Sequence, residues 1–328
     1  MCYIFSLHVI SFLFYDTTMF DLIIIGGGPA GCAAGVYAAR KQLNTLLITK
    51  EFGGQSVVSP EIYNWIGDEK ISGEDLANKL ESHVRSYTAS PHLEIVDSAK
   101  VTDIVKSGDH FEVTTTISDE TFTHQTKTVL VASGSRRRQL DVPGAEKFEH
   151  KGVVYCASCD GPLFSGLDVA VIGGGNAGFE SAAQLLAYAN SVTLLHRRDE
   201  YKADKITVDK VLSNPNMTGI LNAEISEVLG DNFVSGIKYR DQETGTEHRL
   251  DVMGVFVEIG AIPNTEYLKS VIQLDNHGYV EIDPWTQSSN TKGIWAAGDC
   301  TNVKYHQNNI AAGDAVKAIE DIYYYLNT

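Results

Sequence analysis

Short apolar runs alternate with amphipathic segments along most of the chain, a pattern that predicts buried parallel strands connected by helices. The first unit of this kind comprises an apolar run at 20–25, a helical segment at 33–41 and a second apolar run at 44–49. Three glycines with the spacing G-x-G-x-x-G lie between the first run and the helix: Gly26, Gly28 and Gly31. Glycines in this position permit a tight turn and let a pyrophosphate approach the free N–H groups of the helix N-terminus. The sequence therefore predicts a βαβ dinucleotide-binding unit.

Glu51 follows the second strand of this unit, at the position where the motif places an acid that binds ribose hydroxyls. The alternative is a solvated glutamate on the surface. The next segment, 53–68, is predicted to be a loop that runs along the bound cofactor, and 72–89 is predicted to be a helix. Short β-strands follow, separated by Ser-Gly-Asp and Ser-Asp-Glu turns, and are expected to form a β meander: 93–96, 99–105, 111–117 and 121–131.

The same order of elements recurs in the second half of the chain, which indicates an internal duplication of the dinucleotide-binding domain. The repeat is predicted to contain a strand, a helix, a second strand and a β meander, at 168–172, 179–189, 191–195 and 220–259. Its glycine pattern consists of Gly173, Gly175 and Gly178.

The two copies differ in the residues that follow their second strand. The repeat has His196-Arg197-Arg198 there, with Lys202 nearby, in place of the acid of the first copy. A basic cluster at the ribose end of the motif fits a 2′-phosphate, so the second domain is predicted to prefer NADPH to NADH. The alternative is a solvated basic turn.

The last apolar run, 293–299, ends in Gly298-Asp299 and precedes a helix predicted over 309–325. It has no second domain of its own, so we assign it to the first domain, with Asp299 at the strand edge where cofactors bind. A role of Asp299 as a helix cap is compatible with this assignment. The expected fold class is α/β, with two Rossmann-like dinucleotide-binding domains, the second inserted in the first and each with a β meander.

A chain of 328 residues with 43% hydrophobic content can build two domains, each with its own core. The predicted boundaries are 19–134 and 258–328 for the first domain and 135–257 for the second. Residues 1–18 are apolar but lack Lys and Arg, so they make a poor signal peptide. Their apolar run is also too short to span a bilayer, and we leave them out of the predicted fold.

The formal net charge of −16 argues against nucleic acid and against an anionic membrane surface as general partners, because both are negatively charged. Any surface that binds such a partner must therefore be local. Five cysteines in a chain of this length are not the disulfide framework of a secreted protein. A reducing, cytoplasmic environment is expected.

Cys156 and Cys159 form a CxxC pair shortly before the second glycine pattern. Two thiols at this spacing can close a disulfide, and a lowered thiolate pKa makes such pairs exchange electrons readily. Half of a zinc site would need a second pair of ligands, whereas Cys2, Cys32 and Cys300 are isolated in the sequence. No metal site is predicted, and the pair is interpreted as a redox centre that receives electrons from a cofactor.

With two dinucleotide motifs in tandem, a CxxC pair before the second and a closing Ala-Ala-Gly-Asp at 296–299, the sequence resembles the low-molecular-weight thioredoxin reductases from residue 20 to its C-terminus. The resemblance implies FAD in the first domain, bound by Gly26, Gly28, Gly31, Glu51, Gln55, Asp299 and Gln307. It implies NADPH in the second domain, bound by Gly173, Gly175, Gly178, Arg197, Arg198 and Lys202. A homodimer is expected as well.

By the same resemblance, Cys159 is the thiol that faces the flavin, and Cys156 is the thiol that attacks the disulfide of a partner protein. Asp160 is then the acid that manages the protons, a role that also agrees with the chemistry, because each disulfide reduction consumes two protons. Nicotinamide and Cys159 both need a place at the flavin, yet both belong to the inserted domain. Unless they approach opposite faces of the flavin, that domain is expected to swing about the strands near Gly134 and Val257.

One departure from the family pattern concerns the partner. Pro162-Leu163-Phe164 stands where many thioredoxin reductases carry an aromatic pair, and together with Tyr305-His306-Gln307 it looks more like the flavoprotein subunit of alkyl hydroperoxide reductase. That subunit carries thioredoxin-like domains ahead of its FAD motif, whereas 18 residues precede the motif here. The electron acceptor is therefore expected to be a separate protein, thioredoxin or a thioredoxin-like or glutaredoxin-like carrier.

The function predicted from the sequence is that of an NADPH-dependent FAD flavoprotein, a thioredoxin-disulfide reductase that passes electrons from NADPH to FAD, to Cys156 and Cys159, and to a protein disulfide. One alternative is the reductase of another carrier in a peroxide-reduction system. A second is a ferredoxin:NADP-type electron-transfer flavoprotein, against which the CxxC pair argues. A third is a nucleotide-binding regulatory or structural protein in which the CxxC pair is inert.

Overall fold

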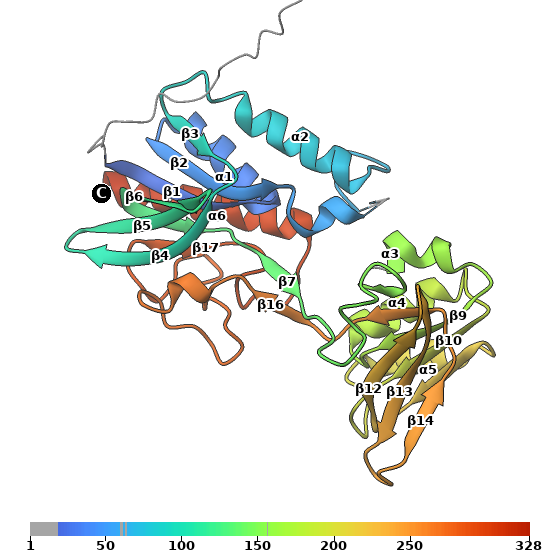
Figure 1. Ribbon diagram of the computed structural model, residues 1–328. Helices are drawn as coiled ribbons and strands as arrows, with labels where there is room; N and C mark the ends of the chain where they lie inside the picture. The colour runs from blue at the N-terminus through green and yellow to red at the C-terminus, as the bar shows by residue number, and fades with distance from the viewer. Residues whose placement is uncertain (1–18, 60–61, 63, 156) are drawn as a thin grey trace, which may run out of the picture.

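The computed structural model describes residues 19–59, 62, 64–155 and 157–328. They form two lobes joined by a two-stranded antiparallel ribbon, as Figure 1 shows. The ribbon consists of β7, Ser135–Arg137, and β16, Ala261–Pro263. The predicted extra segment 1–18 and the predicted redox residue Cys156 lie outside the described residues.

A seven-stranded sheet forms the centre of the first lobe, with the order β3-β2-β1-β6-β5-β4 and with β17 paired to β6. Its strands are β1 Phe20–Gly27, β2 Thr45–Phe52, β3 Leu93–Val96, β4 Lys100–Ser107, β5 His110–Ile117, β6 Glu120–Val131 and β17 Ile294–Ala296. The antiparallel meander consists of β4, β5 and β6. The strand predicted at 93–96 is present but pairs in parallel with β2, so its expected place in the meander is wrong.

The pairing of β17 returns the last apolar run to the first sheet, as predicted. Ile294 lies opposite Val129, and Ala296 lies opposite Val131 on β6. Asp299 therefore follows a strand at the carboxyl edge of the parallel sheet, where ligands of such folds bind.

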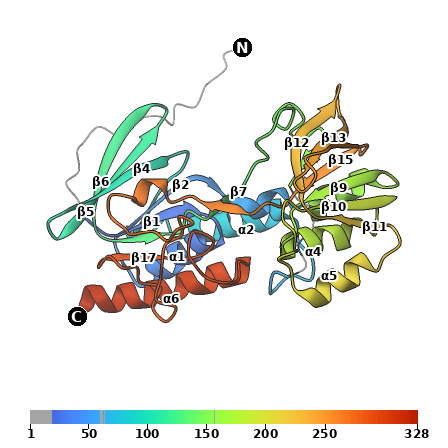
Figure 2. The ribbon, with the colours of Figure 1, turned by 90° about the horizontal axis from the view of Figure 1, so that it is seen from below.

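Three helices pack on one face of this sheet: α1 Pro29–Arg40, α2 Gly73–Arg85 and α6 Asn308–Asn327. Figure 2 shows α6 lying along α1 beneath the strands. Successive residues of β1 alternate between faces, so Leu22 and Ile24 pack against these helices while Ile23 and Ile25 face the core on the other side. Short 3₁₀ turns are η1 Gly54–Val58, within the predicted loop, and η3 Glu266–Leu268.

A five-stranded parallel sheet forms the centre of the second lobe, with the order β11-β10-β9-β15-β8. Its strands are β8 Val153–Val154, β9 Asp168–Ile172, β10 Ser191–Leu195, β11 Met217–Ile220 and β15 Gly254–Val257. The run β11-β10-β9-β15 repeats the order β3-β2-β1-β6 of the first sheet, which agrees with the predicted duplication and with the fold class. The predicted meander at 220–259 missed the outer strand β11 apart from its last residue, and it included β15, which belongs to the parallel sheet instead.

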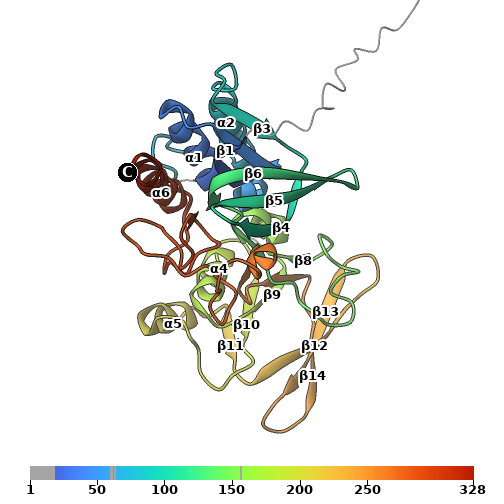
Figure 3. The same ribbon diagram turned by 90° about the vertical axis from the view of Figure 1, so that its left-hand side faces the viewer.

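The remaining strands of the second lobe form a separate three-stranded meander, β12 Ala223–Gly230, β13 Val234–Asp241 and β14 Glu247–Leu250. Figure 3 shows this meander at the far end of the second lobe. The helices are α3 Ala157–Asp160, α4 Asn176–Leu185 and α5 Lys205–Leu212, with the 3₁₀ turn η2 Gly161–Phe164. Helix α5 is absent from the sequence prediction.

Both helices that follow a glycine turn begin earlier than the sequence pattern predicts. Helix α1 starts at Pro29 rather than at residue 33, and α4 starts at Asn176 rather than at residue 179. Proline suits the first turn of a helix, because its missing N–H has no partner there in any case. In the described part of the chain, no helix is long and apolar enough to cross a membrane.

Candidate dinucleotide and dithiol sites

The glycine turn after β1 brings the backbone of α1 against β1 and β6. Gly26 has a φ of +119°, and a Cβ there would lie 2.2 Å from the carbonyl oxygen of Ala132. A Cβ on Gly31 would lie 1.7 Å from the carbonyl oxygen of Gly26. By contrast, a Cβ on Gly28 would have no neighbour closer than the Cα of Gly54, at 3.9 Å. Gly26 and Gly31 are thus required by packing, whereas Gly28 leaves the helix end open to a ligand.

The turn after β9 repeats this division of roles. Gly173 has a φ of +126°, and a Cβ there would lie 2.1 Å from the carbonyl oxygen of Glu258. A Cβ on Gly178 would lie 1.9 Å from the carbonyl oxygen of Gly173. Around Gly175, no described atom lies within 4 Å of the corresponding Cβ position. The second turn is therefore also closed by packing on two sides and open at its middle glycine.

Both helix N-termini are free for an anion. Neither α1 nor α4 has a side-chain cap, and neither has an acidic residue in its first turn. Their first backbone N–H groups and the positive ends of their dipoles are thus not neutralised by the helices themselves. With the open glycines, these two ends fit the pyrophosphate groups of two dinucleotides.

The carboxyl edge of the first sheet brings together residues that are far apart in the sequence. The side-chain Nε2 of Gln55 donates hydrogen bonds to Oγ of Ser135 over 2.9 Å and to Oδ2 of Asp299 over 3.4 Å. Burial raises the pKa of Asp299, and His306, whose Nδ1 lies 3.8 Å from Oδ1, lowers it in part. The structure therefore places Gln55 and Asp299 side by side.

Two further predicted residues of this edge differ in how firmly they are held. Gln307 precedes α6, and its side-chain oxygen accepts a hydrogen bond of 2.9 Å from Nδ2 of Asn64. Glu51 lies in β2 with an exposed side chain that has no ion-pair partner among the described residues. An exposed carboxylate at this strand end is compatible both with a ribose ligand and with the solvated alternative.

The basic cluster after β10 surrounds a buried histidine. Nδ1 of His196 accepts a hydrogen bond of 3.1 Å from the backbone N–H of Gly174, so the neutral ring carries its proton on Nε2. That Nε2 has no partner among the described residues, although His196 is only 8% exposed. The backbone N–H of Lys202 donates to the carbonyl oxygen of Gly174 over 2.8 Å, which folds the cluster onto the glycine turn.

The charges of this cluster are unpaired within the protein. Arg197, Arg198 and Lys202 are exposed, and none has an ion-pair partner in the described part of the chain. The pKa of His196 is lowered chiefly by burial and further by the three neighbouring cations, and a hydrogen bond with the backbone of Glu200 raises it in part. Three cations that lack ion-pair partners among the described residues fit a phosphorylated ribose. His196 was not predicted as a site residue, although it stands directly after the strand that the motif uses.

The dithiol segment lies at the same sheet edge as the second glycine turn. Helix α3, which contains Cys159 and Asp160, follows β8, and β8 pairs in parallel with β15, which in turn pairs with β9. The carboxyl ends of these strands therefore point the same way, toward α3 and toward the N-terminus of α4. Burial raises the pKa of Asp160, while His150 and Arg137 lower it, which leaves a carboxyl group that holds its proton more readily than a free aspartate.

The two remaining cysteines of the described chain are not suited to thiol chemistry. Cys32 and Cys300 are free and buried. Burial raises the pKa of Cys32 to about 12 and that of Cys300 to about 11. Their thiolates are scarce at neutral pH, and thiolate is the reactive form. Within the described residues, no group of three or more side chains that could hold a metal ion is present.

The segment in which the sequence departs from the family pattern presents one apolar side chain to solvent. Leu163 in η2 is 76% exposed. Phe164 is buried instead, with its ring 5.2 Å from that of Phe256 on β15. Of these two side chains, Leu163 is thus the one available to a partner that approaches this segment.

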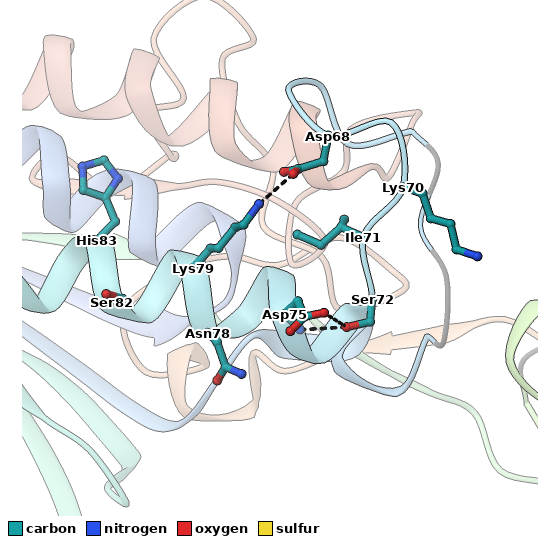
Figure 4. A pocket seen from close by; sticks show the side chains of 9 residues that line it. All are labelled: Asp68, Lys70, Ile71, Ser72, Asp75, Asn78, Lys79, Ser82 and His83. Carbon is teal, nitrogen blue, oxygen red and sulfur yellow. Dashed lines mark hydrogen bonds and ion pairs between the residues drawn. The ribbon is translucent and has the colours of Figure 1, made fainter.

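An open cavity of about 870 Å³ lies elsewhere, beside α2 in the first lobe. Figure 4 shows its lining, in which Lys79 pairs with Asp68 over 2.6 Å and Ser72 caps α2 through Asp75. It contains none of the predicted cofactor or dithiol residues, so we assign it no part in the chemistry.

Comparison with known proteins agrees with this arrangement. The family described as pyridine nucleotide-disulphide oxidoreductase matches residues 20–315. Among solved structures, a Lactococcus lactis thioredoxin reductase in the FR conformation has a TM-score of 0.77 and is 32% identical, covering 94% of this chain and 99% of that one. A thioredoxin reductase of T. acidophilum has a TM-score of 0.75 and is 34% identical, covering 93% of this chain and 98% of that one.

Curated relatives are longer. An NADH dehydrogenase of Bacillus subtilis (strain 168) is 40% identical over 313 residues, which are 95% of this chain and 60% of the relative. An alkyl hydroperoxide reductase subunit of Escherichia coli (strain K12) is 39% identical over 308 residues, which are 94% of this chain and 58% of the relative. This chain thus spans about 60% of the length of these relatives.

The chain belongs to the pyridine nucleotide-disulphide oxidoreductase family. Within it, the predicted resemblance to the low-molecular-weight thioredoxin reductases is confirmed, over nearly the whole length of the solved structures.

Proposed function

We propose that the protein is an NADPH-dependent FAD flavoprotein that reduces the disulfide of a separate carrier protein, with thioredoxin as the first candidate. The observation that carries the proposal is the common edge of the second sheet, where the CxxC helix α3 and the open glycine turn of α4 lie together in a family of disulphide oxidoreductases. A hydride donor and a dithiol on one lobe need an electron carrier on the other, and the first glycine turn offers the place for it.

The first lobe would hold FAD through Gly26, Gly28, Gly31, Glu51, Gln55, Asp299 and Gln307. Bound FAD supplies the redox chemistry that connects a two-electron hydride donor with a disulfide. The open end of α1 at Gly28 would bind the pyrophosphate, and the adjacent Gln55 and Asp299 would orient the rest of the group at the carboxyl edge of the sheet.

The second lobe would hold NADPH through Gly173, Gly175, Gly178, Arg197, Arg198 and Lys202. The three cations would bind the 2′-phosphate by charge-assisted hydrogen bonds, and the free Nε2–H of His196 would donate to the same end of the nucleotide. The open N-terminus of α4 would bind the pyrophosphate.

The dithiol would transfer electrons by exchange. The thiolate of Cys156 would attack one sulfur of the partner disulfide and release the other as a thiolate; Cys159 would then attack the mixed disulfide and release the second. Two protons are needed for the two released thiolates. Asp160, whose pKa is raised by burial, is suited to supply one of them and to be reprotonated from solvent.

The two half-reactions would use different orientations of the lobes. We propose 19–134 with 258–328 and 135–257 as the two domains, joined by the β7–β16 ribbon. Because nicotinamide and dithiol would share one sheet edge, rotation about the ribbon would present each of them to the flavin in turn. An engineered cross-link between the lobes should preserve one half-reaction and abolish the other, and full turnover of the verified cross-linked protein would contradict the rotation.

A second candidate acceptor is another thioredoxin-like or glutaredoxin-like carrier in a peroxide-reduction system. The identity to the alkyl hydroperoxide reductase subunit of Escherichia coli and the Pro162-Leu163-Phe164 segment favour it. A panel of purified carriers, with NADPH consumption and thiol formation followed together, separates the two candidates. Reduction of free flavin or a dye without reduction of any disulfide would replace both by an electron-transfer flavoprotein. The homodimer stays a prediction, which light scattering of the purified protein tests.

A further inference from the structure

Two adjacent arginines of the ribbon strand β7 are bound on opposite sides. Nη2 of Arg136 lies 2.6 Å from Oε1 of Glu266, and its Nη1 donates to Oδ1 of Asn264 over 2.9 Å. Nη1 of Arg137 lies 3.6 Å from Oε2 of Glu258. This division follows from the strand geometry, because successive side chains of a strand point to opposite faces.

Glu266 and Glu258 lie on different lobes, although the proposed boundary at residue 258 puts both of them in the first domain. Glu266 begins η3, whose Leu268 is buried in a core of the first sheet. Glu258 directly follows β15, and the next residue, Ile259, packs against a core of the second lobe. The ribbon is therefore tied by Arg136 to the first lobe and by Arg137 to the second.

Glu258 is held firmly within the second lobe. Its side chain is 11% exposed, and its Oε1 accepts a hydrogen bond of 2.6 Å from Oγ of Ser181 on α4. Its backbone N–H donates to the carbonyl oxygen of Ile172 on β9 over 2.8 Å. The carboxylate that pairs with Arg137 is thus fixed to the nucleotide-binding turn through β9 and α4 and is not a mobile surface group.

The two ends of the ribbon are bound unequally. At the first lobe, Ser133 and Asn264 exchange two hydrogen bonds of 2.6 Å and 3.0 Å, and Gln55 binds Ser135 over 2.9 Å. Each end also has a glycine with a positive φ and open space around it, Gly134 at the first lobe with a φ of +62° and Gly260 at the second with a φ of +102°. Among the described residues, Arg137–Glu258 is the only ion pair between the ribbon and the second lobe. The side-chain contacts are thus more numerous at the first-lobe end, and at the second-lobe end this pair is the ion pair that a rotation must break.

The same arginine also acts on the dithiol segment. Arg137 and His150 both lower the pKa of Asp160, the acid next to Cys159. Burial raises the pKa of Glu258; Ser181 and Arg137 oppose this, and Glu180 adds to it. A movement that separates Arg137 from the second lobe would thus change the charge around both carboxyl groups at once.

We propose that Arg137 and Glu258 form an ionic catch that holds the second lobe in the orientation of this structure and sets the balance between the two orientations. The consequence for turnover rests on the proposed function, but the catch itself does not, since the orientation of the lobes can be measured without a reaction. Arg137 is 42% exposed, so the pair is weakened by solvent, and its loss should change the ratio of the two orientations about threefold.

The test measures the distance between the lobes with paired spin labels on the full-length, FAD-loaded protein. Exposed Thr121 and Asn232 are replaced by Cys for labelling, and Cys2, Cys156 and Cys159 are replaced by Ser. Cys32 and Cys300 stay, because burial and a raised pKa keep them from reacting with the label. Arg137→Ala and Glu258→Gln are compared with Arg136→Ala, the neighbouring arginine whose partners lie in the first lobe.

If the pair acts as a catch, Arg137→Ala and Glu258→Gln should each shift the distribution of distances between the labels in the same direction. The double variant should shift the distribution no further than either single variant. Arg136→Ala should leave the distribution unchanged. A wild-type distribution in both single variants, or an equal shift in all three, would overturn the proposal. Should either variant fail to fold, Arg137→Lys and Glu258→Asp replace them. These substitutions keep the charge but change the length of the side chain, so they must also alter the distribution of distances between the lobes. A shift in the labelled variants, combined with no disulfide reduction by the wild-type protein that retains Cys156 and Cys159, would leave the catch standing and refute the proposed function instead.

Discussion

The backbone N–H of Gly174 donates a hydrogen bond of 3.1 Å to Nδ1 of His196. One buried ring thereby connects the glycine turn of the second lobe with the basic cluster that follows β10. The bond requires a neutral ring, because a protonated Nδ1 cannot accept it. The turn and the cluster therefore behave as one binding site rather than as two neighbouring features.

Replacement of His196 by Ala should weaken NADPH binding about tenfold, because Gly174 loses its acceptor and the nucleotide loses the Nε2–H donor. Calorimetric titration of NADPH measures the effect. His248→Ala is the matched control, since His248 is exposed on β14 and stacks on Tyr239 outside the site. Unchanged affinity in His196→Ala would remove the histidine from the site.

The same histidine should give the protein a distinct sensitivity to acid. Its pKa in the folded state is lowered from 6.5, chiefly by burial, so the unfolded chain binds this proton first as the pH falls. The stabilisation is therefore present above pH 6.5 and is lost as the pH falls below it. Urea unfolding at about pH 7.5 and about pH 5.5 should show a smaller loss in His196→Ala than in the wild type. Equal losses would contradict a neutral, buried ring.

Changing both Arg197 and Arg198 to Ala should raise the KM for NADPH far more than that for NADH. Each charge-assisted contact to a 2′-phosphate contributes ~1.5 to 3 kcal/mol, whereas NADH has no such phosphate to lose. Steady-state kinetics with both nucleotides decides the matter. Parallel losses for the two would favour the solvated basic turn.

Asp160→Asn should slow the thiol–disulfide exchange step about 100-fold, because the amide cannot donate a proton to the released thiolate. In the wild type, the raised pKa of Asp160 keeps the carboxyl protonated to a higher pH than in a free aspartate. The wild-type rate should fall as the pH rises through that pKa, and the variant should show a low rate without this step. Single-turnover oxidation of the reduced enzyme across a pH series provides both profiles, and an unaltered profile in the variant would assign the proton to another group.

Leu163→Glu should raise the KM for a protein carrier about tenfold while leaving the reduction of a small aromatic disulfide unchanged. The exposed side chain follows Cys159 by four residues, in a segment that a partner protein must approach, whereas a small disulfide needs no apolar contact. Ile206→Glu is the control, because Ile206 is 85% exposed on α5 and has no part in the dithiol segment. Equal effects on both substrates would point to damage of the dithiol itself.

The sequence predicted most strands correctly because their ends are marked by turns and their apolar runs are continuous; 93–96, 168–172 and 191–195 match the observed strands. It did not predict which neighbours a short strand pairs with, so β3 and β15 were placed in the meanders although both pair in parallel, and β11 was missed apart from its last residue. Helix α5 was not predicted, because only Val211 of its eight residues is buried and the segment therefore lacks a pronounced apolar face.

The residues of the candidate site that belong to sequence motifs could be predicted from the sequence. Glycine spacing located both turns, since backbone contacts such as Gly31 on Gly26 exclude any side chain. The bond between Gly174 and His196 and the pair of Arg137 with Glu258 lie outside any motif, because their partners meet only through the folded sheet. Such contacts depend on tertiary structure and carry no local pattern.

The most direct test of the account is the transfer of electrons from NADPH to a protein disulfide by the purified, FAD-loaded protein. The account predicts one carrier disulfide reduced for each NADPH consumed in the wild type. It predicts no carrier reduction in Cys156→Ser or Cys159→Ser, while NADPH still reduces the flavin. The account would be contradicted if the wild-type protein used NADPH to reduce dyes but reduced no carrier disulfide.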